Sequence, residues 1–146
     1  MIKISRKKSG FTLAELLIVV AIIAVLAALS IPVFASRLEA SRESVDWSNL
    51  RSAYAIGRMA QLEGGADEGW YDPDSDSLVT KSVALGEQKT AGIQGQNTPK
   101  LPSGIILPSG KTEGCGIYVF APAEGKITVG FAKSKPASAK DNGAWV

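Results

Sequence analysis

The longest hydrophobic stretch of the chain lies near its N-terminus. Residues 16–29 read LLIVVAIIAVLAAL and contain no polar side chain. Between residues 11 and 35, only four positions interrupt the apolar character: Thr12, Glu15, Ser30 and Pro32. A helix of this segment, rising roughly 1.5 Å per residue, would exceed a hydrocarbon core about 30 Å thick. Residues 11–35 are therefore predicted to form a membrane-spanning helix.

A second helical pattern follows. Residues 37–63 contain no proline and only one glycine, Gly57, while Ala, Leu, Arg and Glu predominate. Gly64 and Gly65 predict the end of the helix. Pro32 removes a backbone hydrogen bond from a helix interior, so the helix either stops there or continues; the strongly helical sequence beyond it favours continuation. One helix over residues 11–63 would be roughly 80 Å long, more than a globular domain of this size needs.

The second half of this helix has two apolar sides. One side is formed by Leu38, Val45, Ile56 and Met59. The other, near the opposite direction, is formed by Trp47, Leu50 and Tyr54. One side is expected to cover the protein's own sheet and the other to meet neighbouring molecules. Two pairs have the spacing of ion pairs on a helix surface: Glu39–Arg42 and Arg42–Asp46.

Beyond Gly64 the chain is punctuated by Gly, Pro, Ser, Asp and Asn, as in a β-rich region. Strands are predicted at residues 77–85, 104–107, 116–121 and 126–132. The last two should form a hairpin around residues 122–125, and the final strand alternates as if only one of its faces were buried. The predicted fold class is α+β: one long N-terminal helix whose C-terminal half packs on a small antiparallel β-sheet.

Composition narrows the range of functions. The chain has 146 residues, room for about one domain, and a net charge of +2. Four basic residues and no acid lie in the first ten positions: Lys3, Arg6, Lys7 and Lys8. The remainder carries 12 basic (16 − 4) and 14 acidic side chains, which argues against a nucleic-acid-binding protein. The chain has no His and no nucleophile motif. No function is predicted for its single cysteine, Cys115. Neither an enzyme nor a cofactor is therefore expected.

The basic cluster ahead of the apolar segment predicts a cytoplasmic N-terminus and an external C-terminus. Two interpretations share this pattern. In the first, the segment is an ordinary signal peptide, and cleavage after Ala35 releases a secreted binding module. In the second, the segment is retained. Glu15 favours retention, because a carboxylate at the centre of a membrane helix costs about 2.5–3.5 kcal/mol and marks a functional residue that needs a partner.

The residues around Glu15 form a motif that indicates what this partner is. The motif consists of Gly10, Phe11, Thr12, Leu13, Ala14 and Glu15. Together with the basic leader, this motif resembles the processing site of type IV prepilins. The resemblance implies that a membrane peptidase cuts between Gly10 and Phe11 and methylates the new amine of Phe11. Glu15, then the fifth residue, would pair with the N-terminus of a neighbouring subunit. Pro32 would mark a bend or local melting of the helix inside a filament.

The resemblance also implies a domain organisation and a function. Residues 1–10 would be a removable leader, residues 11–35 the helix of the membrane or filament core, and residues 36–146 a globular head, with helix 36–63 and a sheet region 64–146. The chain would be a structural subunit of a type IV pilus-like filament. Its partners would be other subunits, the prepilin peptidase, an assembly ATPase and an inner-membrane platform protein. A pseudopilin of type II secretion or competence would share the same N-terminus, and a catalytic head is the remotest alternative.

Three acids at every second position suggest a weak calcium site: Asp72, Asp74 and Asp76. The sixth position of a calcium-binding EF-hand loop should be glycine, and the twelfth a bidentate acid. These positions hold Ser77 and Val83. A solvated acidic loop is therefore the preferred interpretation.

Overall fold

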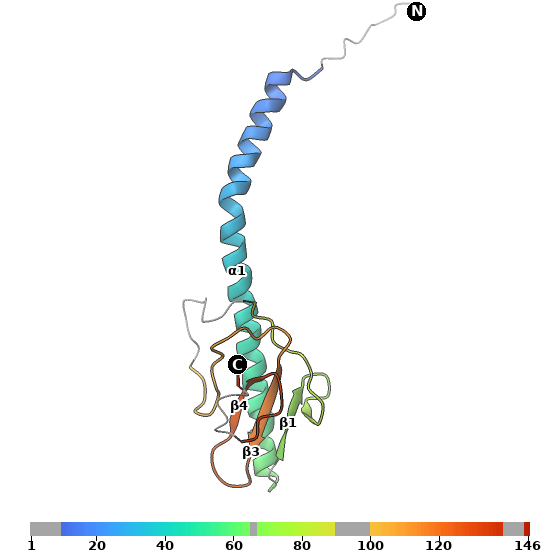
Figure 1. Ribbon diagram of the computed structural model, residues 1–146, viewed down its shortest axis with the longest axis vertical. Coiled ribbons are helices and arrows are strands. Elements are labelled where there is room, and N and C mark those ends of the chain that lie inside the picture. The colour runs from blue at the N-terminus through green and yellow to red at the C-terminus, as the bar shows by residue number, and fades with distance from the viewer. Residues whose placement is uncertain (1–9, 65–66, 90–99, 139–144) are drawn as a thin grey trace, which may run out of the picture. The chain divides into compact units, whose positions relative to one another are not determined.

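The computed structural model describes residues 10–64, 67–89, 100–138 and 145–146. It contains one helix and a four-stranded sheet (Figure 1): α1 (Leu13–Leu62), β1 (Asp67–Asp72), β2 (Ser77–Val79), β3 (Gly116–Ala121) and β4 (Thr128–Ala132). Contacts divide the chain into two compact units, Met1–Ser36 and Arg37–Val146. The second unit contains the sheet and the C-terminal part of α1, and the α+β prediction is confirmed.

The helix passes through Pro32 without interruption. Continuation beyond the proline is therefore confirmed, and the alternative that the helix stops there is wrong. At the other end, the amide of Glu63 still donates to the carbonyl of Met59 at 3.0 Å. Gly64 follows with a φ of 87°, a left-handed conformation that glycine adopts without steric cost and that commonly ends helices. The predicted end thus agrees with the structure to within one residue.

The sheet is antiparallel, with the strand order β2-β1-β3-β4. The predicted hairpin of the last two strands is confirmed, with Val119 opposite Val129. The strand predicted at residues 77–85 is shorter than expected and ends at Val79. The strand predicted at residues 104–107 is wrong, because this segment forms only one isolated bridge, between Ile105 and Val129. Strand β1 (DEGWYD) was not predicted: acids and glycine disfavour strands, and pairing with β2 and β3 overrides that preference.

One side of α1 packs on the sheet and forms the main core. Its buried helix residues are Trp47, Leu50 and Ala53, which join Ile117, Val119, Val129 and Phe131 of the sheet. Gly57 allows the closest approach, since a Cβ at this position would lie 2.8 Å from Cγ1 of Val119. The opposite side of the helix leaves Leu38, Val45 and Met59 exposed. The two-sided prediction holds except for Ile56, which packs partly against the core.

The far face of the sheet is also covered in part. Trp70 and Tyr118 meet edge to face with ring centroids 5.1 Å apart, and Ala132 and Trp145 complete this smaller cluster. A Cβ at Gly130 would lie 2.7 Å from the Trp145 ring. The prediction that β4 is buried on one face only is therefore wrong, because the C-terminal Trp145 lies over the other face.

Candidate processing and assembly site

Gly10 and Phe11 precede the first helical residue of α1, Leu13, and both are exposed. Phe11 keeps 87% of its surface accessible. A Cβ built on Gly10 would meet no atom within 4 Å. The peptide bond between Gly10 and Phe11 thus lies outside the hydrogen-bonded helix, where a peptidase can reach a chain most easily.

Thr12 and Glu15 close the first turn of α1 as a reciprocal capping box. The amide and the hydroxyl of Thr12 both donate to Oε2 of Glu15 at 2.8 Å, and the amide of Glu15 donates to Oγ1 of Thr12 at 3.2 Å. These bonds satisfy donors that a helix start leaves without partners. The Thr-x-x-Glu spacing is a sequence signal for such a cap. The cap was not predicted, because only the charge of Glu15 was considered.

The capping box uses one carboxylate oxygen of Glu15. In the part of the chain that the structure describes, the hydrogen bonds of this carboxylate all end at Oε2. Oε1 therefore has room for a further donor. A carboxylate accepts several donors and binds a cationic amine more strongly than a neutral one.

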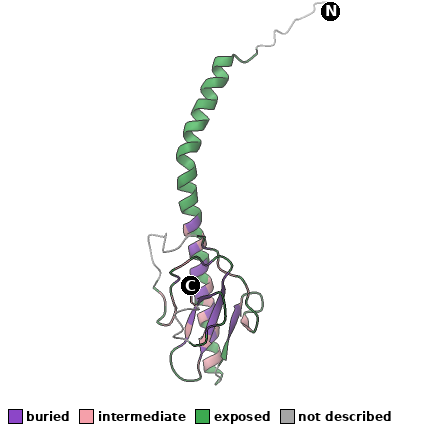
Figure 2. Ribbon diagram, viewed as in Figure 1, coloured by how far each residue is buried: buried purple, intermediate pink, exposed green. Residues whose placement is uncertain are grey.

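The apolar segment after Glu15 is exposed along its length in the part of the chain that the structure describes. Every large hydrophobic side chain from Leu16 to Leu29 keeps 48–68% of its surface exposed, as the exposed colour of this part of α1 in Figure 2 shows. In the described residues, α1 is long and apolar enough to cross a membrane. A continuous apolar surface of this kind requires lipid or other protein chains around it.

Pro32 and two serines weaken the backbone bonding in the second half of this segment. Pro32 has no amide hydrogen, so the carbonyl of Ala28 loses its usual helical donor. The hydroxyl of Ser30 donates to the carbonyl of Leu26 at 2.7 Å, and that of Ser36 to Val33 at 3.0 Å. Such back-bonding often bends helices. The bend or melting of this segment in a filament stays a prediction.

Of the three acids of the suggested calcium site, Asp72 ends β1, and Asp74 and Asp76 lie in the tight turn before β2. Asp72 accepts from the amide of Asp74 at 3.1 Å and from the hydroxyl of Ser75 at 2.7 Å. Tyr71 donates its hydroxyl to Asp76 at 3.3 Å. Across the described ranges, no group of three or more His, Cys, Asp or Glu side chains could hold a metal ion. The arrangement is that of a turn stabilised by its own aspartates.

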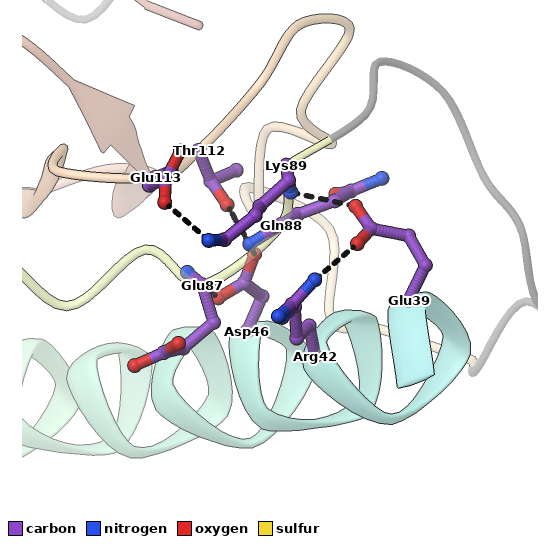
Figure 3. Close-up of polar contacts among 8 residues, drawn as sticks. All are labelled: Glu39, Arg42, Asp46, Glu87, Gln88, Lys89, Thr112 and Glu113. Atoms are coloured by element: carbon purple, nitrogen blue, oxygen red, sulfur yellow. Dashed lines mark hydrogen bonds and ion pairs between the residues drawn. The ribbon is translucent and has the colours of Figure 1, made fainter. Parts of the chain in front are cut away.

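A buried polar cluster joins α1 to the connection between β2 and β3 (Figure 3). Asp46, only 1% exposed, accepts from the amides of Glu87 and Gln88 at 2.9 and 3.3 Å. It also accepts a short hydrogen bond from the hydroxyl of Thr112. Burial raises the pKa of Asp46, although these hydrogen bonds act in the opposite direction. The expected pairing of Arg42 with Asp46 is therefore wrong.

The same cluster contains the helix ion pair that was predicted correctly. Nη1 of Arg42 lies 3.0 Å from Oε2 of Glu39. Oε1 of Glu39 also accepts a hydrogen bond from the amide of Lys89 at 2.6 Å. Lys89 in turn pairs with Glu113 at 3.1 Å. Two segments far from the helix in sequence are thus tied to it. The signal in the sequence was the position of Glu39, Glu43 and Asp46 on the same side of the helix as Trp47 and Leu50.

Cys115 lies beside this cluster and is 1% exposed. Burial raises the pKa of its thiol, which disfavours the reactive thiolate. Cys115 and Asp46 are both buried and therefore not accessible to a reactant.

Comparisons with known proteins identify a known motif in the N-terminal region. The family described as "Prokaryotic N-terminal methylation motif" matches residues 5–31. The chain is similar to the type IV major fimbrial protein FimA of Dichelobacter nodosus, with 32% identity over 124 residues that cover 83% of this chain and 73% of that protein. No solved structure matches the chain. Taken with the exposed apolar helix and its N-terminal motif, the chain belongs to the type IV pilin family and is a pilus or pseudopilus subunit.

Proposed function

We propose that the chain is a membrane-inserted precursor that is cut between Gly10 and Phe11, methylated at Phe11 and polymerised through its apolar helix. The observation that carries the proposal is the position of the methylation motif. The match covers the exposed Gly10–Phe11 bond and the capped Glu15, directly ahead of an apolar segment whose large side chains are exposed in the described residues. Pilins are generally structural subunits, so the activity proposed is assembly and not catalysis.

In this proposal, residues 1–10 are the leader, residues 11–35 the membrane and filament-core helix, and residues 36–146 the head. The division of contacts after Ser36, one residue beyond the last boundary, supports its position. Before assembly the subunit crosses the inner membrane once, with its basic N-terminus in the cytoplasm. It then moves into an extracellular pilus or an envelope pseudopilus. The prepilin peptidase, an assembly ATPase and a membrane platform protein are its partners.

Glu15 provides the register of assembly. Cleavage creates a positively charged amine at Phe11, and methylation keeps that charge. Oε1 of Glu15, which the capping box leaves open, accepts the amine of a neighbouring subunit. In surroundings of low dielectric constant the attraction is strong and offsets part of the cost of burying both charges. Pro32 gives the helix a point at which it can bend as subunits pack.

The alternative of a secreted binding module is less compatible with the structure. Cleavage after Ala35 would cut α1 between two helical residues, Ala35 and Ser36. A pseudopilus of type II secretion or competence remains a close relative of the proposal, because it uses the same N-terminal chemistry.

Intact-mass spectrometry of the membrane fraction tests the processing step. We expect a chain that begins at Phe11 and carries one additional methyl group. Gly10→Phe should block this cut, because a bulky side chain replaces hydrogen at the cleavage position. Ala35→Phe is the matched control: it should leave processing unchanged, although it would block an ordinary signal peptidase. A mature chain that begins at Ser36 would contradict the proposal.

A further inference from the structure

The outward side of α1 in the unit Arg37–Val146 carries a basic row beside apolar residues. The basic row consists of Arg37, Arg51 and Arg58, which are all exposed and recur at multiples of seven residues, so that they follow one side of the helix. Leu38, Val45 and Met59 recur in the same way next to them, with exposures of 54%, 44% and 55%. The helix acids of this unit are all buried: Glu39, Glu43 and Asp46. Within α1 of this unit, the exposed charge is therefore positive, and the exposed Glu63 follows the last helical residue.

Two arginines of the basic row, Arg51 and Arg58, donate to neutral acceptors. Arg51 donates to the carbonyl of Lys100 at 3.5 Å, and Arg58 donates to the side-chain oxygen of Gln61 at 2.9 Å. None of the ion pairs among the described residues includes an arginine of this row. A guanidinium has five N–H donors and suits the planar, bidentate geometry of a carboxylate. The basic row can therefore accept an acidic partner from outside.

The β1–β2 hairpin has the complementary charge. Residues 67–76 read DEGWYDPDSD, with five acids and no basic residue. Asp74 and Asp76 are exposed at the tip of the turn, and no ion pair of the described residues involves either one. Strand β2 is the outermost strand of the sheet, so the acidic turn lies at the margin of the unit. Its aspartates are thus available to another molecule.

We propose that the basic row of one subunit docks against the acidic β1–β2 turn of a second copy of this chain. The occupant follows from charge complementarity, and the apolar residues beside the basic row add area that is removed from water. The two surfaces differ, so the contact is heterologous and can repeat from copy to copy into an open filament. The inference rests on the proposed function and adds to it a lateral contact between heads.

Charge exchange in the full-length protein tests the contact. Arg51→Glu, Arg58→Glu and Asp74→Arg each place like charges across the interface, and each should reduce sheared filaments by at least about tenfold. Asp74→Arg combined with Arg51→Glu or with Arg58→Glu should restore filaments to within about threefold in at least one combination. Asp76 is left unchanged because its φ of 48° and its bond to Tyr71 belong to the turn. Lys111→Glu is the control for the two Arg→Glu variants: it makes the same change in net charge at another exposed site and should leave filaments unchanged.

Subunit levels in the membrane fraction verify that each variant folds and inserts. A second measurement uses co-expressed Arg58→Cys and Asp74→Cys chains, which should form a disulfide-linked dimer within filaments; Cys115 is too buried to interfere. Filaments at wild-type levels from all single variants would overturn the contact and leave the proposed function intact. Loss of filaments that neither combination restores would assign the basic row to another occupant, such as anionic lipid, and would also overturn it. Absence of filaments from the unaltered chain would instead count against the proposed function.

Discussion

Glu15→Gln separates the charge of this residue from its role in the helix cap. Glutamine can replace glutamate in a capping box, so the first turn of α1 keeps its bonds while the negative charge is lost. Thr12→Val makes the opposite change: it removes the hydroxyl that takes part in two of the three bonds and leaves the charge. Glu15→Leu removes both.

The magnitudes decide which variant is more harmful. Loss of a helix cap typically costs about 1 kcal/mol, or about fivefold in an equilibrium. An amine of Phe11 that enters an apolar core without its counter-charge costs roughly 3–5 kcal/mol, more than about 100-fold. Glu15→Gln and Glu15→Leu should therefore abolish or strongly reduce filaments, whereas Thr12→Val should reduce them only a few-fold. Membrane insertion of Glu15→Leu should even improve, because an acid leaves an apolar segment.

Electron microscopy of sheared filaments, with subunit levels in the membrane fraction, measures these effects. Intact mass of the same samples verifies that cleavage after Gly10 still occurs, since Gly10 and the basic leader lie on the other side of the cut. Normal filament numbers from Glu15→Gln would refute the ion-pair role. A loss in Thr12→Val as severe as in Glu15→Gln would show that the cap, and not the charge, governs assembly.

Three further predictions concern the head. Gly57→Ala should lower the thermal unfolding temperature. Alanine adds about 1 kcal/mol of helix propensity, but its Cβ would lie 2.8 Å from Cγ1 of Val119, and such overpacking costs about 1–3 kcal/mol. A higher unfolding temperature would contradict this prediction. Because burial raises the pKa of Asp46, the folded state holds that proton more tightly than the unfolded chain. The contribution of Asp46 to the free energy of unfolding should thus fall as pH rises from about 4 through the raised pKa. Asp46→Asn should remove this fall, and identical pH profiles of both proteins would exclude it. Finally, the fragment from Arg37 onward should be a soluble monomer with a cooperative melt by circular dichroism, whereas an aggregated or unfolded fragment would argue against an independent unit.

The sequence by itself determined the helix, the last hairpin and the N-terminal motif. These features depend on local signals: an apolar run, helix-forming residues, a terminal glycine and two alternating segments around a turn. The helix predicted over residues 11–63 is observed at Leu13–Leu62, and the strand predicted at residues 116–121 is observed at Gly116–Ala121. The Thr12–Glu15 cap was equally local and could have been predicted from its spacing.

Only the tertiary structure decided the placement of the acids and of the irregular strands. Asp46 has the spacing of a surface ion pair with Arg42, but the amides of Glu87 and Gln88 lie against it and make its burial possible. Strand β1 has unfavourable residues and exists because it pairs on both edges. Both outcomes depend on donors and partner strands that are remote in sequence, and no local periodicity contains them. Gly57 also depends on remote partners. A glycine destabilises an isolated helix, but here it allows the sheet to approach α1 closely.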